Sequence, residues 1–268
     1  MQLNTSNLKV LPVDGSELTY LAKGEGPPVL LIHGAGGLIE IWNEVQGALA
    51  TTHKVVAYDR RGLGRSPNPT PDVRVHARDA AAMIEQVAGE PSIVVGWSWG
   101  ASVAMELIRS HPKLVKAAVL IEPTFHFRPS VGTLLQFIKA QFMSSLGRKR
   151  AGVGVIFRTL FGRRSGGSGW DELDTDQREL FFFNMEGPPA EAKPHEFWFD
   201  LKYISVSSVA SWTVPVKYLI GDDTLREFEK CLEVLTSEAS QIKTVRIPGA
   251  CHLIPLQEPD AVVEAVRG

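Results

Sequence analysis

The chain has 268 residues, of which 44% are hydrophobic and 22% are charged, and its formal net charge is -2. This composition is ordinary for a soluble globular protein, and the length suits one large α/β domain with an insertion. The small net charge produces no large field of one sign, so neither nucleic acid nor a membrane surface is implied as a partner.

The N-terminal residues contain no basic start followed by an apolar stretch, and no apolar run reaches the roughly 20 residues that span a bilayer. We therefore expect a cytoplasmic protein. The two cysteines, Cys231 and Cys251, are too few for a disulfide framework. The seven histidines show no spacing typical of metal ligands, so we expect no metal site, and no cofactor is implied.

The chain begins with two short strand patterns, residues 8–13 and 17–22, on either side of a turn signal at Asp14 and Gly15. Residues 29–32 then form a continuous apolar run, as is typical of a strand buried in a parallel sheet. The loop after this run consists of His33, Gly34, Ala35, Gly36 and Gly37. Its glycines leave backbone N–H groups uncovered, which favours half of an oxyanion hole, with a plain glycine-rich connection as the alternative.

Residues 55–58 predict the next buried strand, and a charged loop follows from Asp59 to Ser66. Its two glycines, Gly62 and Gly64, lie too close together for a dinucleotide fingerprint, and the lysine of a phosphate-binding loop is missing. We interpret the loop as one pinned by ion pairs. Residues 79–87 have the apolar spacing of a helix.

An apolar strand at residues 93–95 runs into Gly96, Trp97, Ser98, Trp99 and Gly100, and a small-residue helix follows. The pattern Gly-x-Ser-x-Gly in this setting predicts a nucleophile elbow, a sharp turn that exposes a serine hydroxyl to a base and a substrate. The flanking glycines provide clearance for the neighbouring strand and helix. The alternative is a crossover whose serine only caps the helix.

Another buried strand, residues 117–121, ends at Glu122, and from about residue 124 to 212 the character of the chain changes. This region has helical stretches at 131–146, 152–161 and 176–185 and many large aromatic residues, which predicts an inserted helical cap. Most of the aromatic side chains are expected to hold the cap together. Five basic residues are interpreted as a solvated face of the cap: Arg148, Lys149, Arg150, Arg163 and Arg164.

The sheet resumes at residues 216–220, and Asp222, Asp223 and Thr224 follow the strand. A helix at 226–235, a last strand at 243–247 and a terminal helix at 259–267 complete the alternation of strands and helices. That alternation predicts an α/β fold with a mostly parallel sheet. His252 lies in the loop after the last strand, where its ring could reach Ser98 over the sheet edge and act as a base.

The order of these motifs resembles the α/β-hydrolase fold superfamily over nearly the whole chain. The resemblance implies an eight-stranded, mostly parallel sheet with an antiparallel start and an inserted helical cap. The core domain would then comprise residues 1–123 and 213–268, and the cap residues 124–212. It also implies Ser98 as nucleophile, His252 as base, and the N–H groups of Ala35 and Trp99 as the oxyanion hole.

The position where most members of the superfamily carry the catalytic aspartate is Thr224 in this chain. Some members instead place the acid after the strand that follows the nucleophile helix, and Glu122 occupies that position. We therefore expect Glu122 to be the acid, with Asp223 and Asp222 as the alternatives.

The predicted activity is hydrolysis of a mostly apolar carboxylic ester or lactone through an acyl-enzyme. Two alternatives remain open: a carbon–carbon bond hydrolase or lyase on the same triad, and a small-molecule receptor without catalysis. Because the nucleophile is a serine, dehalogenase and epoxide hydrolase chemistry through an aspartate is disfavoured. Substrate contacts are expected from Gly34, Gly36, Trp97, Phe125 and Trp198.

Overall fold

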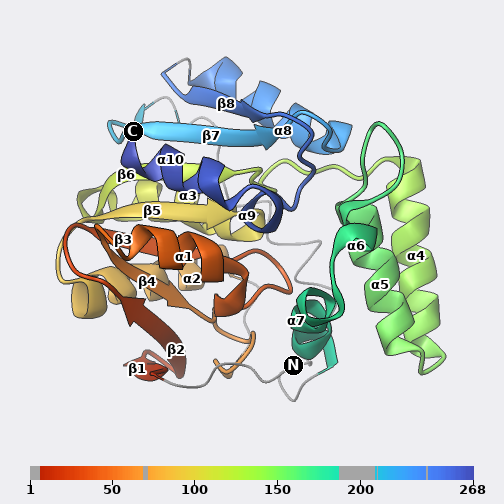
Figure 1. The fold of residues 1–268 in the computed structure, drawn as a ribbon, viewed down its shortest axis with the longest axis horizontal. Helices are drawn as coiled ribbons and strands as arrows, with labels where there is room; N and C mark the ends of the chain where they lie inside the picture. The colour runs from red at the N-terminus through yellow and green to blue at the C-terminus, as the bar shows by residue number, and fades with distance from the viewer. Residues whose placement is uncertain (1–6, 69–71, 187–208, 210, 240) are drawn as a thin grey trace.

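The computed structural model describes residues 7–68, 72–186, 209, 211–239 and 241–268. An eight-stranded sheet forms its centre, with the strand order β1-β2-β4-β3-β5-β6-β7-β8 (Figure 1). The first two neighbouring pairs are antiparallel and the other five are parallel, which confirms the sheet expected from the resemblance. The strands are β1 Lys9–Val13, β2 Ser16–Lys23, β3 Pro28–Ile32, β4 Lys54–Tyr58, β5 Ser92–Trp97, β6 Val115–Ile121, β7 Val216–Gly221 and β8 Lys243–Ile247.

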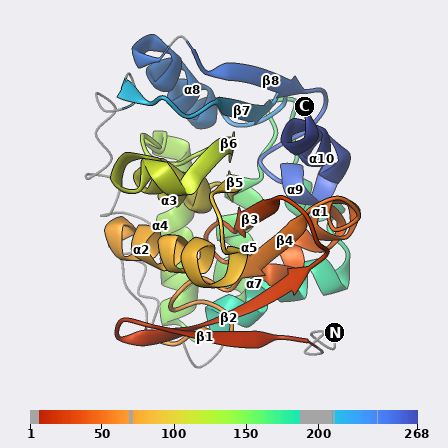
Figure 2. The same ribbon diagram turned by 90° about the vertical axis from the view of Figure 1, so that its left-hand side faces the viewer.

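Helices cover both faces of the sheet. In Figure 2, α2 and α3 lie on one side of the strands and α1 and α10 on the other. The helices of the core and their short neighbours are η1 Ile39–Trp42, α1 Asn43–Leu49, α2 Val73–Met83, the π-helical turn η2 Ile84–Ala88, α3 Trp99–Ser110, η3 Pro112–Leu114, α8 Arg226–Glu238, α9 Ile254–Gln257 and α10 Pro259–Arg267.

The side chains of the central strands alternate between two hydrophobic clusters. Leu30 on β3 and Val94 on β5 point into the cluster with α2, α3 and α8, whereas Leu31 and Val95 point into the cluster with α1 and α10. All four are fully buried. A strand that is covered on both faces has apolar side chains on both, because neither face meets water. This explains why β3 and β5 are continuous apolar runs in the sequence.

One helix begins earlier than the sequence predicts. We expected a helix at residues 79–87, but α2 begins at Val73. The Asp72 side chain accepts a hydrogen bond from the Arg74 N–H at 2.9 Å, so it caps the helix start. The first turns carry polar residues between their apolar ones, and the cap rather than hydrophobic spacing determines where this helix begins.

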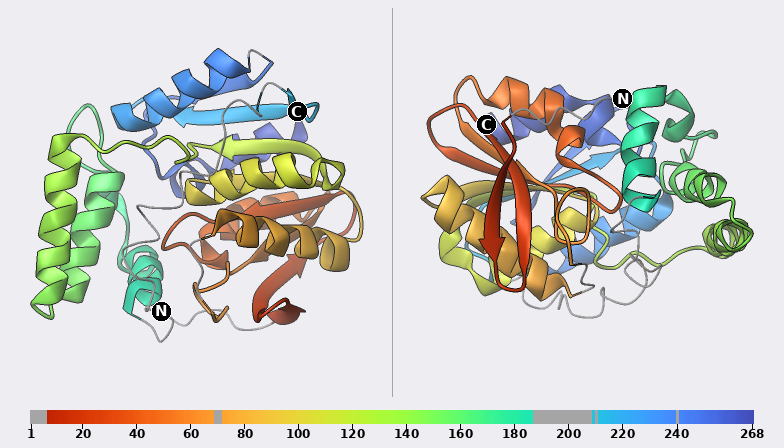
Figure 3. Two further views of the ribbon diagram at one scale, coloured as in Figure 1. Left: turned by 180° about the vertical axis from the view of Figure 1, so that it is seen from behind. Right: turned by 90° about the horizontal axis from the view of Figure 1, so that it is seen from below.

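In the described part of the connection between β6 and β7, four helices lie at the end of the sheet where the parallel strands terminate (Figures 1 and 3). They are α4 Val131–Ser145, α5 Lys149–Leu160, α6 Gly169–Glu172 and α7 Thr175–Glu186. Within the residues described, none of the helices is long and apolar enough to cross a bilayer. Four aromatic residues of this segment are buried together against the sheet: Phe157, Phe161, Trp170 and Phe181.

Candidate active site

Ser98 lies between β5 and α3 with φ 56° and ψ -120°, a backbone conformation that non-glycine residues rarely adopt. Its N–H donates to the carbonyl oxygen of Ile121 on β6 at 2.8 Å, which fixes the turn against the sheet. Strain of this kind persists only where the surrounding structure imposes it. The turn places the Ser98 hydroxyl at the wall of a cavity instead of among the strand side chains.

The two glycines of the motif are required by close packing. A Cβ atom at Gly96 would lie 2.5 Å from the carbonyl oxygen of Gly100, and one at Gly100 would lie 2.5 Å from that of His33. Gly34 is equally constrained, because a Cβ atom there would lie 2.9 Å from the Cβ atom of Ser98. Backbone oxygens at Gly96 and Gly100 and the Ser98 side chain at Gly34 therefore leave no room for a Cβ atom at these glycines.

His252 connects Ser98 to a carboxylate. Its Nε2 lies 2.9 Å from Ser98 Oγ, and its Nδ1 lies 2.5 Å from Glu122 Oε2. His252 is 2% exposed and Glu122 is fully buried, so water competes little for either contact. With Nδ1–H donating to the carboxylate, Nε2 is left as an acceptor that can take the Ser98 proton.

Glu122 is anchored by two donors from the β7 side in addition to His252. The Gly221 N–H donates to Oε1 at 2.9 Å, and the Thr224 hydroxyl donates to Oε2 at 3.0 Å. Thr224 thus supports the carboxylate from the position where an aspartate was expected from the resemblance. Glu122 itself has a φ of 42°, and its own N–H donates to Leu219 O at 3.2 Å. Together these contacts hold the Glu122 carboxylate facing His252.

The carboxylates of the two alternative acids form hydrogen bonds with other groups. Asp222 accepts a hydrogen bond from the Gly249 N–H at 2.6 Å. Asp223 accepts from the Ser165 N–H at 2.8 Å and from the Ser165 hydroxyl at 2.5 Å, and the bond from the hydroxyl contributes most to lowering its pKa. It also lies 3.4 Å from the Arg163 guanidinium. The Asp222 carboxylate thus faces the loop after β8 and the Asp223 carboxylate faces the connection before α6, whereas the Glu122 carboxylate faces His252.

Aromatic side chains fix the imidazole in its plane. Phe228 of α8 stacks on His252 with ring centroids 3.9 Å apart and planes 16° from parallel. The Trp97 indole N–H donates to the backbone oxygen of His252 at 2.7 Å. Sequence reasoning proposed Trp97 as a substrate contact and missed Phe228, because a phenylalanine on a helix resembles any core residue.

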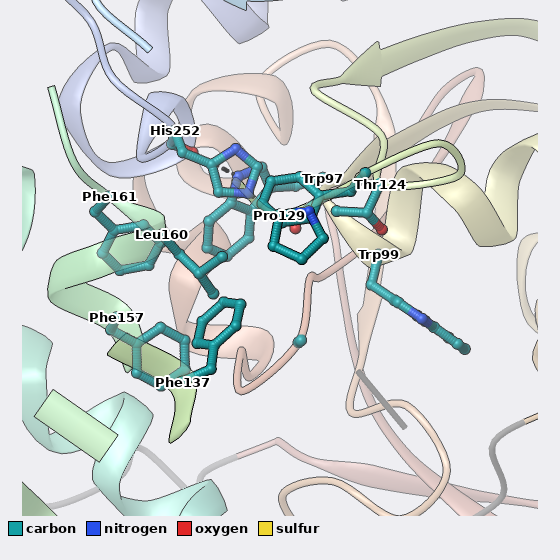
Figure 4. Close-up of a pocket in the computed structure, with 12 residues that line it drawn as sticks. Trp97, Trp99, Thr124, Pro129, Phe137, Phe157, Leu160, Phe161 and His252 are labelled. Carbon is teal, nitrogen blue, oxygen red and sulfur yellow. Dashed lines mark hydrogen bonds between the residues drawn. The ribbon is translucent and has the colours of Figure 1, made fainter. Parts of the chain in front are cut away.

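The loop after β3 lies on the opposite side of Ser98 from β6. Ala35 and Trp99 line the cavity next to Ser98, and no hydrogen bond is formed by either backbone N–H within the described residues. The Trp99 indole points away from the phenylalanine cluster (Figure 4) and lies under the Arg60 guanidinium, 4.3 Å from its centroid. This leaves the backbone of Trp99, at the N-terminus of α3, facing the nucleophile.

His33 shapes this loop as a neutral side chain. Its Nε2 accepts a hydrogen bond from the Arg60 N–H at 2.9 Å, and its Nδ1 lies 2.8 Å from Gly34 O. Burial, followed by the nearby charge of Arg60, holds the pKa of His33 well below its usual value. The proton is therefore on Nδ1, which donates to Gly34 O and fixes the turn before Ala35.

Asn184 of α7 ties the helices between β6 and β7 to the same loop, and sequence reasoning missed it. Its amide N–H2 donates to the carbonyl oxygens of Gly36 and Gly37 at 2.8 and 2.5 Å, and its oxygen accepts from the Gly64 N–H at 2.5 Å. The side chain is 3% exposed. A lone asparagine in an aromatic-rich helix carries no signal in the sequence that distinguishes it from a surface residue.

A cavity of ≈ 70 Å³ adjoins Ser98, several times the roughly 10–15 Å³ that one water molecule needs on this measure. The ring and aliphatic side chains that surround it come mainly from β5, the connection after β6, α4 and the end of α5, with Ala35, Trp99 and His252 contributed by the loop after β3, α3 and the loop after β8 (Figure 4). The lining residues are Ala35, Trp97, Ser98, Trp99, Thr124, Phe127, Pro129, Phe137, Phe157, Leu160, Phe161 and His252. Among the described lining residues, Thr124 brings the only polar side chain besides Ser98, His252 and the two indoles.

The residues expected to contact substrate differ in their position relative to the cavity. Trp97 lines the cavity. Gly34 packs against Ser98 and Gly36 against the Phe157 ring, so both lie behind the wall. Phe125 is 3% exposed and belongs to the core cluster with α2 and α3, away from the lining. Trp198 lies outside the described residues. Their contact with substrate stays a prediction.

The ion pairs expected in the loop after β4 are present. Asp59 pairs with Arg65 at 2.6 Å, Arg61 pairs with Asp79 at 2.7 Å, and Arg65 also pairs with Glu40. Arg60, the fourth charged residue of the loop, instead donates to the backbone oxygen of His33 at 2.9 Å. Over the described ranges, no group of three or more His, Cys, Asp or Glu residues is placed to hold a metal ion.

With this geometry in view, the comparisons with known proteins are decisive for the family. The family model described as "Alpha/beta hydrolase family" matches residues 29–265. The chain belongs to the alpha/beta hydrolase family.

Among curated relatives of this alpha/beta hydrolase, the uncharacterized hydrolase YraK of Bacillus subtilis (strain 168) is 37% identical over 123 residues, which cover 44% of this chain and 45% of YraK. The chain thus matches less than half of the length of that relative. The solved structure of Est816, described as an N-acyl homoserine lactone degrading enzyme, has a TM-score of 0.77 and 19% identity over 97% of this chain and 99% of its own.

A bromoperoxidase from Bacillus anthracis has a TM-score of 0.77 and 18% identity to this alpha/beta hydrolase, covering 97% of this chain and 98% of its own. At such low identity, these two solved structures support the fold alone. A lactone-degrading enzyme and a bromoperoxidase share this fold, so the reaction of this chain follows from its own site and not from the fold.

Proposed function

We propose that the chain is a serine hydrolase that cleaves a carboxylic ester or lactone of a mostly apolar substrate through an acyl-enzyme. One observation carries the proposal: Ser98 Oγ, both ring nitrogens of His252 and the Glu122 carboxylate form one buried chain with contacts of 2.9 and 2.5 Å. A hydroxyl, a base and an orienting acid in this order are what nucleophilic acyl transfer needs.

In the proposed mechanism, His252 Nε2 takes the proton from Ser98 as Oγ attacks the substrate carbonyl. Glu122 stabilises the imidazolium and holds the ring in place, while Gly221 and Thr224 hold the carboxylate. His252 then gives the proton to the leaving alkoxide, and the acyl-enzyme forms. Water attacks the acyl group with His252 again as the base, and Ser98 is released.

The N–H groups of Ala35 and Trp99 are proposed to bind the oxyanion. Both residues line the cavity beside Ser98 and neither N–H has another acceptor in the described part of the chain. A preorganised donor of this kind lowers the barrier by on the order of 3 kcal/mol. Trp99 adds the positive end of α3, which favours developing negative charge.

The cavity wall supports an apolar substrate. Phe127, Phe137, Phe157 and Phe161 line it together with Pro129 and Leu160, and none of the described lining residues is an Asp, Glu, Lys or Arg. Burial of apolar surface would provide most of the binding energy, and the carbonyl would be oriented by the oxyanion donors. Because Est816, which shares the fold, is described as an N-acyl homoserine lactone degrading enzyme, lactones are tested beside esters.

The test is covalent labelling with a fluorophosphonate followed by turnover of p-nitrophenyl esters and a lactone panel. We expect the wild-type protein to be labelled, Ser98→Ala to remain unlabelled, and at least one ester or lactone to be hydrolysed. Labelling without turnover of any ester or lactone would favour a carbon–carbon bond hydrolase or lyase on the same residues. A wild-type protein left unlabelled beside a labelled reference esterase would favour the receptor.

A further inference from the structure

Helix α4 exposes an apolar face. Phe142 is 63% exposed and Leu135 is 59% exposed, although both are large hydrophobic residues. The exposed members follow the spacing i, i+3, i+4, i+7, i+11 and i+15, which places them on one side of a helix. They are Val131, Leu134, Leu135, Ile138, Phe142 and Leu146, and we call them the outer face of α4.

The other side of α4 already has its packing partners. Thr133 and Ala140 are buried, and α4 packs along α5. Phe137 lines the cavity next to Ser98. The outer face is therefore not needed to attach the helix, and α4 forms the outer edge of the molecule (Figure 1). Single exposed apolar residues are ordinary, but six on one face of a helix mark an interaction surface.

Basic residues accompany this face. The segment from residue 124 to 160 contains no aspartate or glutamate, although the whole chain has a formal net charge of -2. Arg150 and Arg158 of this segment pair with Glu179 and Asp171. The exposed side chains of Lys139, Arg148 and Lys149 form no ion pair with a described residue, and they lie beside the outer face or directly after it.

This charge pattern distinguishes two possible partners of the outer face, a second copy of the chain and a lipid membrane. If two copies paired through α4, the basic residues of each helix would face a partner segment that has no carboxylate to neutralise them. An anionic lipid surface supplies the missing negative charge and also accepts the apolar side chains. A helix with an apolar face and neighbouring lysine and arginine residues is typical of segments that lie in the plane of a membrane interface.

We propose that α4 docks this protein on an anionic phospholipid membrane, with its outer face in the interface and Lys139, Arg148 and Lys149 at the headgroups. Docking would bring the cavity behind Phe137 close to a phase in which apolar substrates dissolve. The proposal concerns the surface of the cap helices and stands whether or not Ser98 is a nucleophile.

The test measures binding of the full-length Ser98→Ala protein to vesicles by co-sedimentation, so that lipid hydrolysis cannot affect the result. One set of vesicles is phosphatidylcholine and the other is an equimolar mixture of phosphatidylcholine and phosphatidylglycerol. We expect binding to the anionic vesicles to be about tenfold stronger or more, because each juxtamembrane basic residue contributes separately. Added salt should weaken it.

Two variants separate the apolar from the electrostatic part. The double variant Ile138→Gln/Phe142→Gln should bind anionic vesicles about tenfold more weakly, because two large side chains no longer enter the interface. The triple variant Lys139→Gln/Arg148→Gln/Lys149→Gln should lose the preference for anionic lipid. Neither set lines the cavity, so circular dichroism and, in a Ser98 background, ester turnover report whether the fold is intact.

A matched control is Val10→Gln on β1. Val10 is 53% exposed and lies across the molecule from α4 (Figure 1), so its replacement should leave vesicle binding unchanged. Equal binding of the wild type and the double variant would overturn the proposal. A second result would also overturn it: no vesicle binding, together with a wild type that is dimeric in solution and a double variant that is monomeric. In that case the outer face of α4 would be an interface between two copies of the chain.

Discussion

Replacing Glu122 by glutamine tests which carboxylate completes the site. The wild-type carboxylate accepts from the Gly221 N–H on one oxygen and from Thr224 and His252 on the other. A glutamine has one oxygen and one NH2 group at these positions. If its oxygen stays with Gly221, the NH2 group faces His252 Nδ1 and donates to it.

That contact would reverse the tautomer of His252. With Nδ1 accepting, the ring proton moves to Nε2, which is 2.9 Å from Ser98 Oγ and would then donate to the hydroxyl instead of receiving its proton. Changes of this kind in related triads lower kcat by about 10⁴-fold, equivalent to about 5 kcal/mol of barrier. We expect Glu122→Gln to lose activity to about this extent.

The assay is kcat for a p-nitrophenyl ester, together with the rate of fluorophosphonate labelling. Asp223→Asn and Asp222→Asn are the matched controls, since each is the same carboxylate-to-amide change in a residue bound to other partners. We expect both controls to keep kcat within about tenfold of the wild type. A larger loss in Asp223→Asn than in Glu122→Gln would refute the reasoning and move the acid to the loop after β7.

Four further predictions follow from single contacts. Trp97→Phe removes the N–H that holds the His252 backbone and should lower kcat about tenfold, about 1.4 kcal/mol; an unchanged kcat would assign Trp97 to packing only. Asn184→Ala should lower kcat by a similar factor, about tenfold, because the loop beside Ala35 loses its anchor; equal turnover by both proteins would contradict this. Gly100→Ala should lower the free energy of unfolding in urea by about 1–3 kcal/mol, because the added methyl group overlaps backbone. His33→Gln should flatten the dependence of stability on pH: the folded pKa of His33 lies below the usual 6.5, so its contribution is present above pH 6.5 and lost as the pH falls below it. Identical slopes of melting temperature against pH in the two proteins would exclude this role.

Much of the architecture was readable from local patterns. The strand Lys243–Ile247 and the helix Pro259–Arg267 have the bounds that their apolar spacing predicted. The turn at Ser98 was marked by its two glycines, since only glycine tolerates backbone atoms at 2.5 Å from a Cβ position. Where the sequence misplaced an element, as at the start of α2, a capping side chain rather than hydrophobic spacing was the determining feature.

The contacts of the candidate site were harder to predict from the sequence. Thr224 was recognised only as the absence of an aspartate, whereas the structure has it donating to Glu122. Phe228 and Asn184 come from helices that are far from Ser98 in the sequence. The outer face of α4 was not foreseen either, because an apolar helix in an aromatic-rich segment predicts burial.

The amino-acid sequence by itself determined the alternation of strands and helices, the strained turn at Ser98 and the position of His252 after the last strand. Periodicity and turn chemistry depend on residues that are neighbours in the chain, so a local pattern contains them. Only the tertiary structure decided which carboxylate meets His252, what supports it, and which side of α4 stays open. Those outcomes depend on the order of the strands in the sheet and on distances between segments more than 100 residues apart, which no local pattern encodes.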